Sequence, residues 1–92
     1  MLIRSQDKMC LTNMAQVTDI FCNESRNGES RNITAMMSNA DTTHLGTYST
    51  KEKAIKVLNM ICNFYTEHLE EIYNDQNPFV RSVFQMPQDS EV

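Results

Sequence analysis

The chain lacks tryptophan, has only two glycines and two prolines, and carries no excess of positive charge. Two glycines are too few for a glycine-rich phosphate-binding loop. The formal net charge of −4 argues against a protein whose main task is to bind a nucleic-acid backbone, which usually needs a clear cationic excess. No apolar run approaches the roughly 18 residues of a membrane span, and the N-terminus is apolar and then charged, the reverse of a signal peptide. We therefore expect a cytoplasmic protein with no membrane association and no direct nucleic-acid binding.

Cysteine and histidine are also scarce, and their spacing matches no known site. The three cysteines form no CxxC pair, and the two histidines, His44 and His68, belong to no HxxxH or HExxH motif. Cys10 and His44 could meet across a sheet as nucleophile and base, but a buried small hydrophobe is the better interpretation of Cys10. We expect no metal, no cofactor and no enzymatic activity, with His44 in a strand, His68 on the polar side of a helix, and reduced, buried thiols at Cys10, Cys22 and Cys62.

The 92 residues are enough for one domain with one core, and the first half of the chain predicts short strands. β-Branched and aromatic residues favour a strand over residues 17–22, and Asn27-Gly28 is a turn signal because both residues tolerate a positive φ. Strands joined by short links favour an antiparallel meander. The predicted fold is α+β, with a meander of about five strands at residues 1–5, 9–13, 17–22, 31–38 and 42–48.

One long helix is predicted to cover this meander. Ser49 is the expected N-cap, and Glu52 completes a capping box. Apolar residues then recur every three or four positions over about 25 residues, or roughly 37 Å of helix, up to a stop at Asn77-Pro78. Because that length exceeds the sheet, the helix should overhang it from about Tyr65. The apolar stripe consists of Ala54, Val57, Leu58, Ile61, Phe64, Tyr65, Leu69 and Ile72.

After the helix, residues 78–86 are predicted to be a strand or a short helix. As a strand, Val80, Phe84 and Met86 share one face. As a helix starting at Pro78, four apolar residues cluster instead: Phe79, Val80, Val83 and Phe84. We prefer the strand, added to the sheet or to another subunit. The domain is expected to span residues 1–87, followed by a flexible acidic tail at residues 88–92.

The helix carries its charges against its own dipole. Lysines occupy its first turns, at Lys51, Lys53 and Lys56, and carboxylates its last, whereas the dipole favours the opposite arrangement. The carboxylates are either a solvated face or a surface for a basic partner, and the nearby apolar residues are either core, a dimer seam or part of that surface. The basic end is the competing contact surface. The candidate partner-binding site consists of Tyr65, Glu67, Glu70, Glu71, Tyr73 and Asp75.

About half of the chain resembles a loose group of small, mostly uncharacterised proteins from phages, prophages and mobile elements of Gram-positive bacteria. The resemblance implies a protein that acts inside a bacterium, where small proteins of this kind are often inhibitors of host defence or adaptors. The residues that carry it are Ile3-Arg4-Ser5-Gln6-Asp7-Lys8, Leu11-x-Asn13, Leu45-Gly46-x-Tyr48-x-Thr50-x-Glu52-x-Ala54-x-x-Val57-Leu58-x-x-Ile61 and Val83-Phe84-Gln85-Met86-Pro87.

Three hypotheses about function follow. The first is a non-enzymatic protein, expected as a homodimer, that binds and inhibits a host protein, for example an anti-CRISPR acting on a nuclease effector, with carboxylates standing where phosphates would bind. The second is an oligomer that binds a nucleotide or another small molecule near the helix N-terminus, using Arg4, Lys8, Lys51 or Lys53. The third is a structural or regulatory phage protein.

Overall fold

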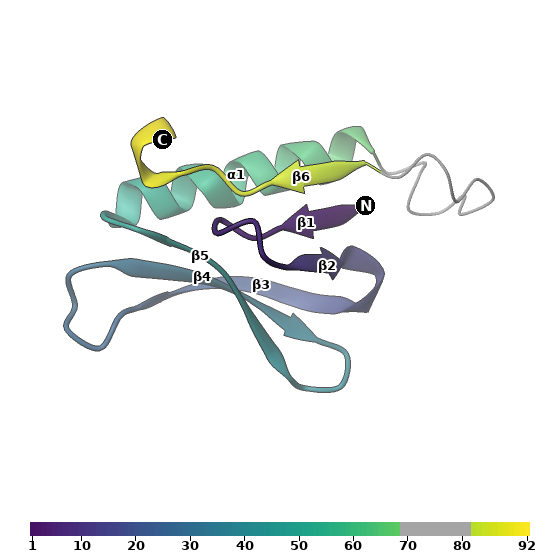
Figure 1. Ribbon diagram of the computed structural model, residues 1–92, viewed down its shortest axis with the longest axis horizontal. Coiled ribbons are helices and arrows are strands. Elements are labelled where there is room, and N and C mark those ends of the chain that lie inside the picture. The colour runs from purple at the N-terminus through teal and green to yellow at the C-terminus, as the bar shows by residue number, and fades with distance from the viewer. Residues whose placement is uncertain (69–81) are drawn as a thin grey trace.

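The computed structural model describes residues 1–68 and 82–92, and in them the chain folds into two three-stranded sheets and one long helix. The fold is α+β, as predicted. In Figure 1 the helix α1 (Lys51–Glu67) runs behind the strand β6, and the β3–β4–β5 sheet lies beneath them in the view. The strands are β1 (Leu2–Arg4), β2 (Leu11–Asn13), β3 (Val17–Glu24), β4 (Arg31–Met37), β5 (Thr42–Tyr48) and β6 (Val83–Gln85).

The larger sheet is an antiparallel meander in the order β3-β4-β5. Its first turn uses Gly28 at φ 71°, as the Asn27-Gly28 pair predicted, and its second turn places Ala40 at φ 71°. On β4, Ile33 and Ala35 are fully buried and face the core. The alternation of apolar residues along β4 therefore correctly predicted its inward face.

Two β-bulges shift the side-chain alternation of the outer strands. On β3 the pairing passes from Val17–Met37 to Asp19–Met36, which leaves Thr18 as the extra residue. On β5 it passes from Gly46–Ile33 to His44–Thr34, which leaves Leu45 as the extra residue. An extra residue moves every later side chain to the opposite face. Consecutive residues Leu45 and Gly46 are accordingly both buried.

The first two strands form a second sheet instead of the start of one continuous meander. This sheet has the order β2-β1-β6, with β2 antiparallel and β6 parallel to β1. A 3-10 turn at Met14–Gln16, capped by the Asn13 side chain accepting from Ala15 N, separates β2 from β3. The turn redirects the chain, so β2 and β3 join different sheets. The predicted strand after the helix is present as β6, and it pairs with β1 of the same chain.

The side chain of Gln6 joins the two sheets. Its Oε1 accepts from Thr47 N at 2.9 Å, and its Nε2 donates to Thr47 O at 3.0 Å and to Pro87 O at 3.3 Å. The Gln6 backbone N donates to Leu45 O at 2.8 Å. Gln6 thus occupies the outer edge of β5 as a strand would. A Cβ at Gly46 would lie 3.2 Å from Cβ of Gln6, so glycine permits this approach.

The helix α1 begins one residue later than its sequence predicts. Thr50 is the N-cap, with an extended backbone and a side-chain oxygen that accepts from Lys53 N at 3.1 Å. The prediction of Ser49 with Glu52 as a capping box is wrong, because Ser49 N instead donates to the Asp89 carboxylate at 2.8 Å. This bond ties the start of the helix to the C-terminal residues.

The buried stripe of α1 packs into one core that draws on both sheets. Ala54, Val57 and Ile61 are buried in the helix, and Phe64 meets Phe84 edge-on with ring centroids 5.3 Å apart. The helix ends at Glu67 with His68 as its cap. The rest of the predicted 25-residue stripe, with its overhang and its stop at Asn77-Pro78, lies outside the described residues.

Residues 88–92, expected to be a flexible tail, pack against the body of the protein. Asp89–Glu91 form a 3-10 helix, the Gln88 side chain donates to Gln6 O at 2.7 Å, and Val92 packs against the core. The prediction of buried thiols is wrong for Cys10 and Cys62, which are exposed, and Cys22 is half-buried. No helix in the described part of the chain is long and apolar enough to cross a membrane.

We expect Gln6→Ala to lower the free energy of unfolding by about 2–3 kcal/mol, because it removes three hydrogen bonds and leaves half-buried Thr47 backbone groups unpaired. Urea denaturation would measure this change. Gln16→Ala is the matched control, since the exposed Gln16 side chain makes one hydrogen bond among the described residues, from Ser38 Oγ, and its loss should cost less than about 0.5 kcal/mol. A similarly small cost for Gln6→Ala would contradict the role given to Gln6.

We expect Ala40→Gly to raise the free energy of unfolding by about 0.5–1 kcal/mol, because relief of the strained positive φ outweighs the added entropy of the unfolded chain. The same change at exposed Ala15, whose φ is not positive, should be destabilising. Thermal unfolding of the two variants gives the comparison. Equal effects at both positions would show that the backbone at Ala40 is not strained.

Candidate functional site

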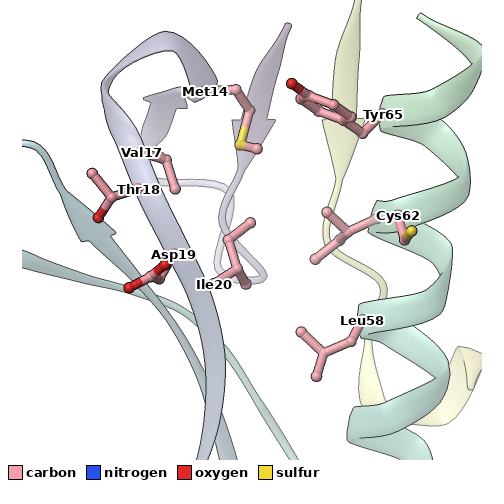
Figure 2. Close-up of a pocket in the computed structure, with 9 residues that line it drawn as sticks. Met14, Val17, Thr18, Asp19, Ile20, Leu58, Cys62 and Tyr65 are labelled. Carbon is pink, nitrogen blue, oxygen red and sulfur yellow. The ribbon is translucent and has the colours of Figure 1, made fainter. Parts of the chain in front are cut away.

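A groove of about 450 Å³ lies between β3 and α1. Figure 2 shows its two walls, with Met14, Val17 and Ile20 pointing from one side toward Leu58 and Tyr65 on the helix. Its full lining is Met14, Val17, Thr18, Asp19, Ile20, Leu58, Ile61, Cys62 and Tyr65.

The bulge at Thr18 builds the strand wall of this groove. Without it, Val17 and Ile20 would point to opposite faces of β3, since they are three residues apart. The extra residue brings both side chains to the helix side, where each packs against the core. Thr18 and Asp19 then point away from the helix, as Figure 2 shows. The Thr18 hydroxyl donates to Met36 O at 3.3 Å.

The helix wall follows from ordinary helical spacing. Leu58, Ile61, Cys62 and Tyr65 stand at positions i, i+3, i+4 and i+7, which form one face of a helix. Ile61 is buried, Leu58 and Tyr65 are half-buried, and Cys62 is exposed. The groove therefore lies at the border of the core, where the apolar stripe of α1 is only partly covered.

The chemistry of the groove suits recognition. Its lining contains no histidine, and Asp19 is the one charged residue in it. Within residues 1–68 and 82–92, no group of three or more histidine, cysteine, aspartate or glutamate side chains could hold a metal ion. A mostly apolar groove with one carboxylate at its rim can bind an apolar side chain or segment.

The structure places two of the six residues of the sequence-predicted site. Tyr65 lines the groove, and Glu67 is exposed at the end of α1. Glu70, Glu71, Tyr73 and Asp75 lie outside the described residues. Sequence reasoning missed the whole strand wall, because a strand with apolar residues three apart gives no periodic signal. Of the helix wall, Leu58, Ile61 and Tyr65 belong to the predicted apolar stripe, and Cys62 does not.

The two histidines contact neighbours on their own elements. His44 lies in β5 as expected, with Nε2 3.1 Å from the Thr47 hydroxyl. His68 departs from the prediction of a polar-side position, because its ring stacks on Phe64 with centroids 4.2 Å apart and its Nδ1 lies 2.8 Å from Phe64 O. A pocket of about 100 Å³ beside His44 is lined by the β1–β2 turn and β5. There Ser5 Oγ and Met9 N donate to the Asp7 carboxylate and lower its pKa.

The N-terminus of α1 is occupied by a carboxylate of the protein itself. Asp89 accepts from Ser49 N, and Lys53 Nζ lies 3.4 Å from Asp89 Oδ2 and donates to Asp89 O at 2.9 Å. The Ser49 hydrogen bond is the main cause of the lowered pKa of Asp89, with Lys53 adding to it. Burial raises the pKa of Tyr48, whose hydroxyl donates to Pro87 O at 2.7 Å, and Asp89 and Glu91 raise it further.

Comparison of the chain with protein families, with characterised proteins and with solved structures finds no significant match.

We expect the stability difference between the protein and Asp89→Asn to depend on pH. The asparagine amide can still accept from Ser49 N, but it lacks the carboxylate charge. The pKa of Asp89 is lower in the folded protein than its ordinary value of 3.8, so its charge stabilises the fold above pH 3.8. This contribution is lost as the pH falls through the pKa of the folded state. The parent should therefore be more stable near pH 7, and the two should converge near pH 2. Chemical denaturation across pH tests this, and a difference independent of pH would contradict it. The pKa of Asp7 is also lowered, but Asp7 is present in both proteins, so its contribution cancels from the stability difference.

Proposed function

We propose that this chain is a non-enzymatic interaction protein that binds a partner protein through the groove between β3 and α1. The observation that carries the proposal is the groove itself, walled by apolar side chains from two elements and bordered by Asp19. Its volume of about 450 Å³ falls within the range of about 300–1,000 Å³ typical of binding pockets.

The lining has the composition of a protein contact surface. Tyrosine and methionine are enriched in such interfaces, and charged residues are depleted at their centres and found at their rims. Tyr65 and Met14 stand at the same end of the groove in Figure 2, and the one charge, on Asp19, points away from the helix. Glu67 is exposed at the end of α1, but it stands two residues after Tyr65 and therefore on another side of the helix, so Asp19 is the one carboxylate of the groove lining.

The partner we propose is a host protein of a bacterium that carries the phage or mobile element. The resemblance to phage and mobile-element proteins supports this setting, and the net charge of −4 suits a basic partner such as a defence nuclease. Binding would inhibit by occlusion, with Asp19 and the exposed Glu67 at the end of α1 as candidate contacts for a basic surface of the nuclease. The protein would block its partner sterically and by charge, with no catalytic step.

The nucleotide-binding alternative is less favoured, because the Asp89 carboxylate already lies beside the N-terminus of α1, where it binds Ser49 N and Lys53. A phosphate at the N-terminus of α1 would compete with the Asp89 carboxylate for Ser49 N and Lys53. Thr50 Oγ1 also accepts the Lys53 backbone N–H. Phosphate binding would first have to displace the C-terminal segment.

Groove blockage gives a direct test. Cys62 is exposed and lines the groove, so Cys62→Trp should fill it with little effect on the core and weaken binding of the captured host protein by at least about 10-fold. Asn59→Trp places the same side chain at an exposed helix position outside the groove and should bind within about 2-fold of the parent. Affinity capture from host lysate, then titration of the recovered protein against both variants, provides the measurement.

If the partner is a nuclease, its activity should be inhibited by Asn59→Trp and should not be inhibited by Cys62→Trp. Glu67→Lys should weaken inhibition if the acidic end of α1 lies against a basic surface of the nuclease. Equal binding and inhibition by Cys62→Trp and the parent would refute the groove as the contact site.

A further inference from the structure

The strand β3 offers the one long open edge among the described strands. It has a single neighbour, β4, and the backbone of residues 18–24 makes no hydrogen bond outside its own sheet within the described residues. The opposite edge of that sheet, β5, is occupied by Gln6 at Leu45 and Thr47. The edges of the smaller sheet, β2 and β6, are three residues each, whereas β3 has eight.

Proteins usually protect a long edge with lysine, proline or a bulge. β3 contains no lysine and no proline, its charged residues are Asp19 and Glu24, and its bulge at Thr18 lies near its first residue. Residues 20–24 pair regularly with β4, so their outer edge is a regular strand edge. An open, regularly paired edge of this kind is a template for one more strand, and its carboxylates favour a basic one.

The open edge and the groove belong to the same element. Val17 and Ile20 of β3 form the strand wall, and Leu58 and Tyr65 of α1 face them across the groove (Figure 2). A segment laid along β3 would hydrogen-bond to the strand through its backbone and place alternate side chains in the groove. A helical segment would satisfy its own backbone and leave the β3 edge unpaired.

The charge of Asp19 indicates which side chains the added segment should carry. Asp19 is the only charged residue in the groove lining, and within the described residues its carboxylate makes no hydrogen bond or ion pair. A lysine or arginine of the segment, on the face that points away from the groove, would pair with it. Apolar residues at alternate positions would meet the apolar walls.

We propose that the partner contributes an extended segment, apolar at alternate positions and basic between them, that adds to the outer edge of β3 as a fourth strand of the β3–β4–β5 sheet. This assignment rests on the proposed function, because it specifies what occupies the groove. The segment binds by main-chain hydrogen bonds to β3, by apolar side chains in the groove, and by a cation against Asp19.

The test uses the full chain and a synthetic eight-residue peptide of alternating valine and lysine. Two further versions carry backbone N-methyl groups, one on the valines and one on the lysines. Because the N–H groups of alternate residues face the same edge of a strand, only one methylated version should lose binding, by at least about 10-fold. A version with glutamate in place of lysine should bind weakly to the protein and better to Asp19→Lys.

Two readouts locate the peptide. Amide NMR shifts should concentrate in β3 and in the groove-lining residues of α1. Alkylation of Cys62 should slow several-fold in the complex, while exposed Cys10, which does not line the groove, should react at its free rate as an internal control.

Strand addition would be overturned if the unmodified peptide did not bind at millimolar concentration. It would also be overturned if the two methylated versions behaved alike, either both binding or both failing to bind. Protection of Cys10 instead of Cys62 would overturn the location. The proposed function is tested separately, because a host partner that distinguishes Cys62→Trp from Asn59→Trp would still support the groove even if strand addition failed. Equal capture by those two variants would refute the groove itself.

Discussion

The fold depends on one side chain, Gln6, which forms the hydrogen bonds that a neighbouring strand would form at the edge of β5. Gln6 hydrogen-bonds to both backbone groups of Thr47 and to Pro87 O, and so connects the smaller sheet, the edge of β5 and the C-terminal segment. Glycine at position 46 permits the approach. A 92-residue chain buries a modest fraction of its surface, so a connection that lets two small sheets share one core matters for its stability. The same connection covers the β5 edge at Leu45 and Thr47, and β3 has the longest open edge among the described strands.

The two bulges explain how short strands build both the core and a binding groove. The bulge at Leu45 lets adjacent residues face inward and leaves Leu45 O for Gln6. The bulge at Thr18 turns Val17 and Ile20 to the same side, toward α1. Among the described residues, the helix covers the sheet without filling the space beside β3, so the apolar groove opens there. A groove at the side of a helix-covered sheet is where an added strand finds both hydrogen bonds and apolar contacts.

Much of the architecture could be predicted from local patterns, including the α+β class, most strand positions, the Gly28 turn and the buried stripe of α1. What could not be predicted depends on contacts between distant residues. Asp89 takes Ser49 N, which moves the N-cap to Thr50. Composition and spacing do not show that two thiols are exposed. At the site, the helix wall apart from Cys62 lay within the predicted stripe, whereas the strand wall needed a bulge for which the sequence carries no signal.

The central claim is that the β3 edge is open and is completed by an added strand. Hydrogen exchange of single backbone amides tests it most directly, on the full chain alone and with the alternating valine–lysine peptide bound. In the free protein, the outward amides of residues 18–24 should exchange rapidly while those facing β4 exchange slowly, and the peptide should slow the outward set. Uniform protection of β3 in the free chain, or peptide-induced protection confined to the smaller sheet, would contradict the account.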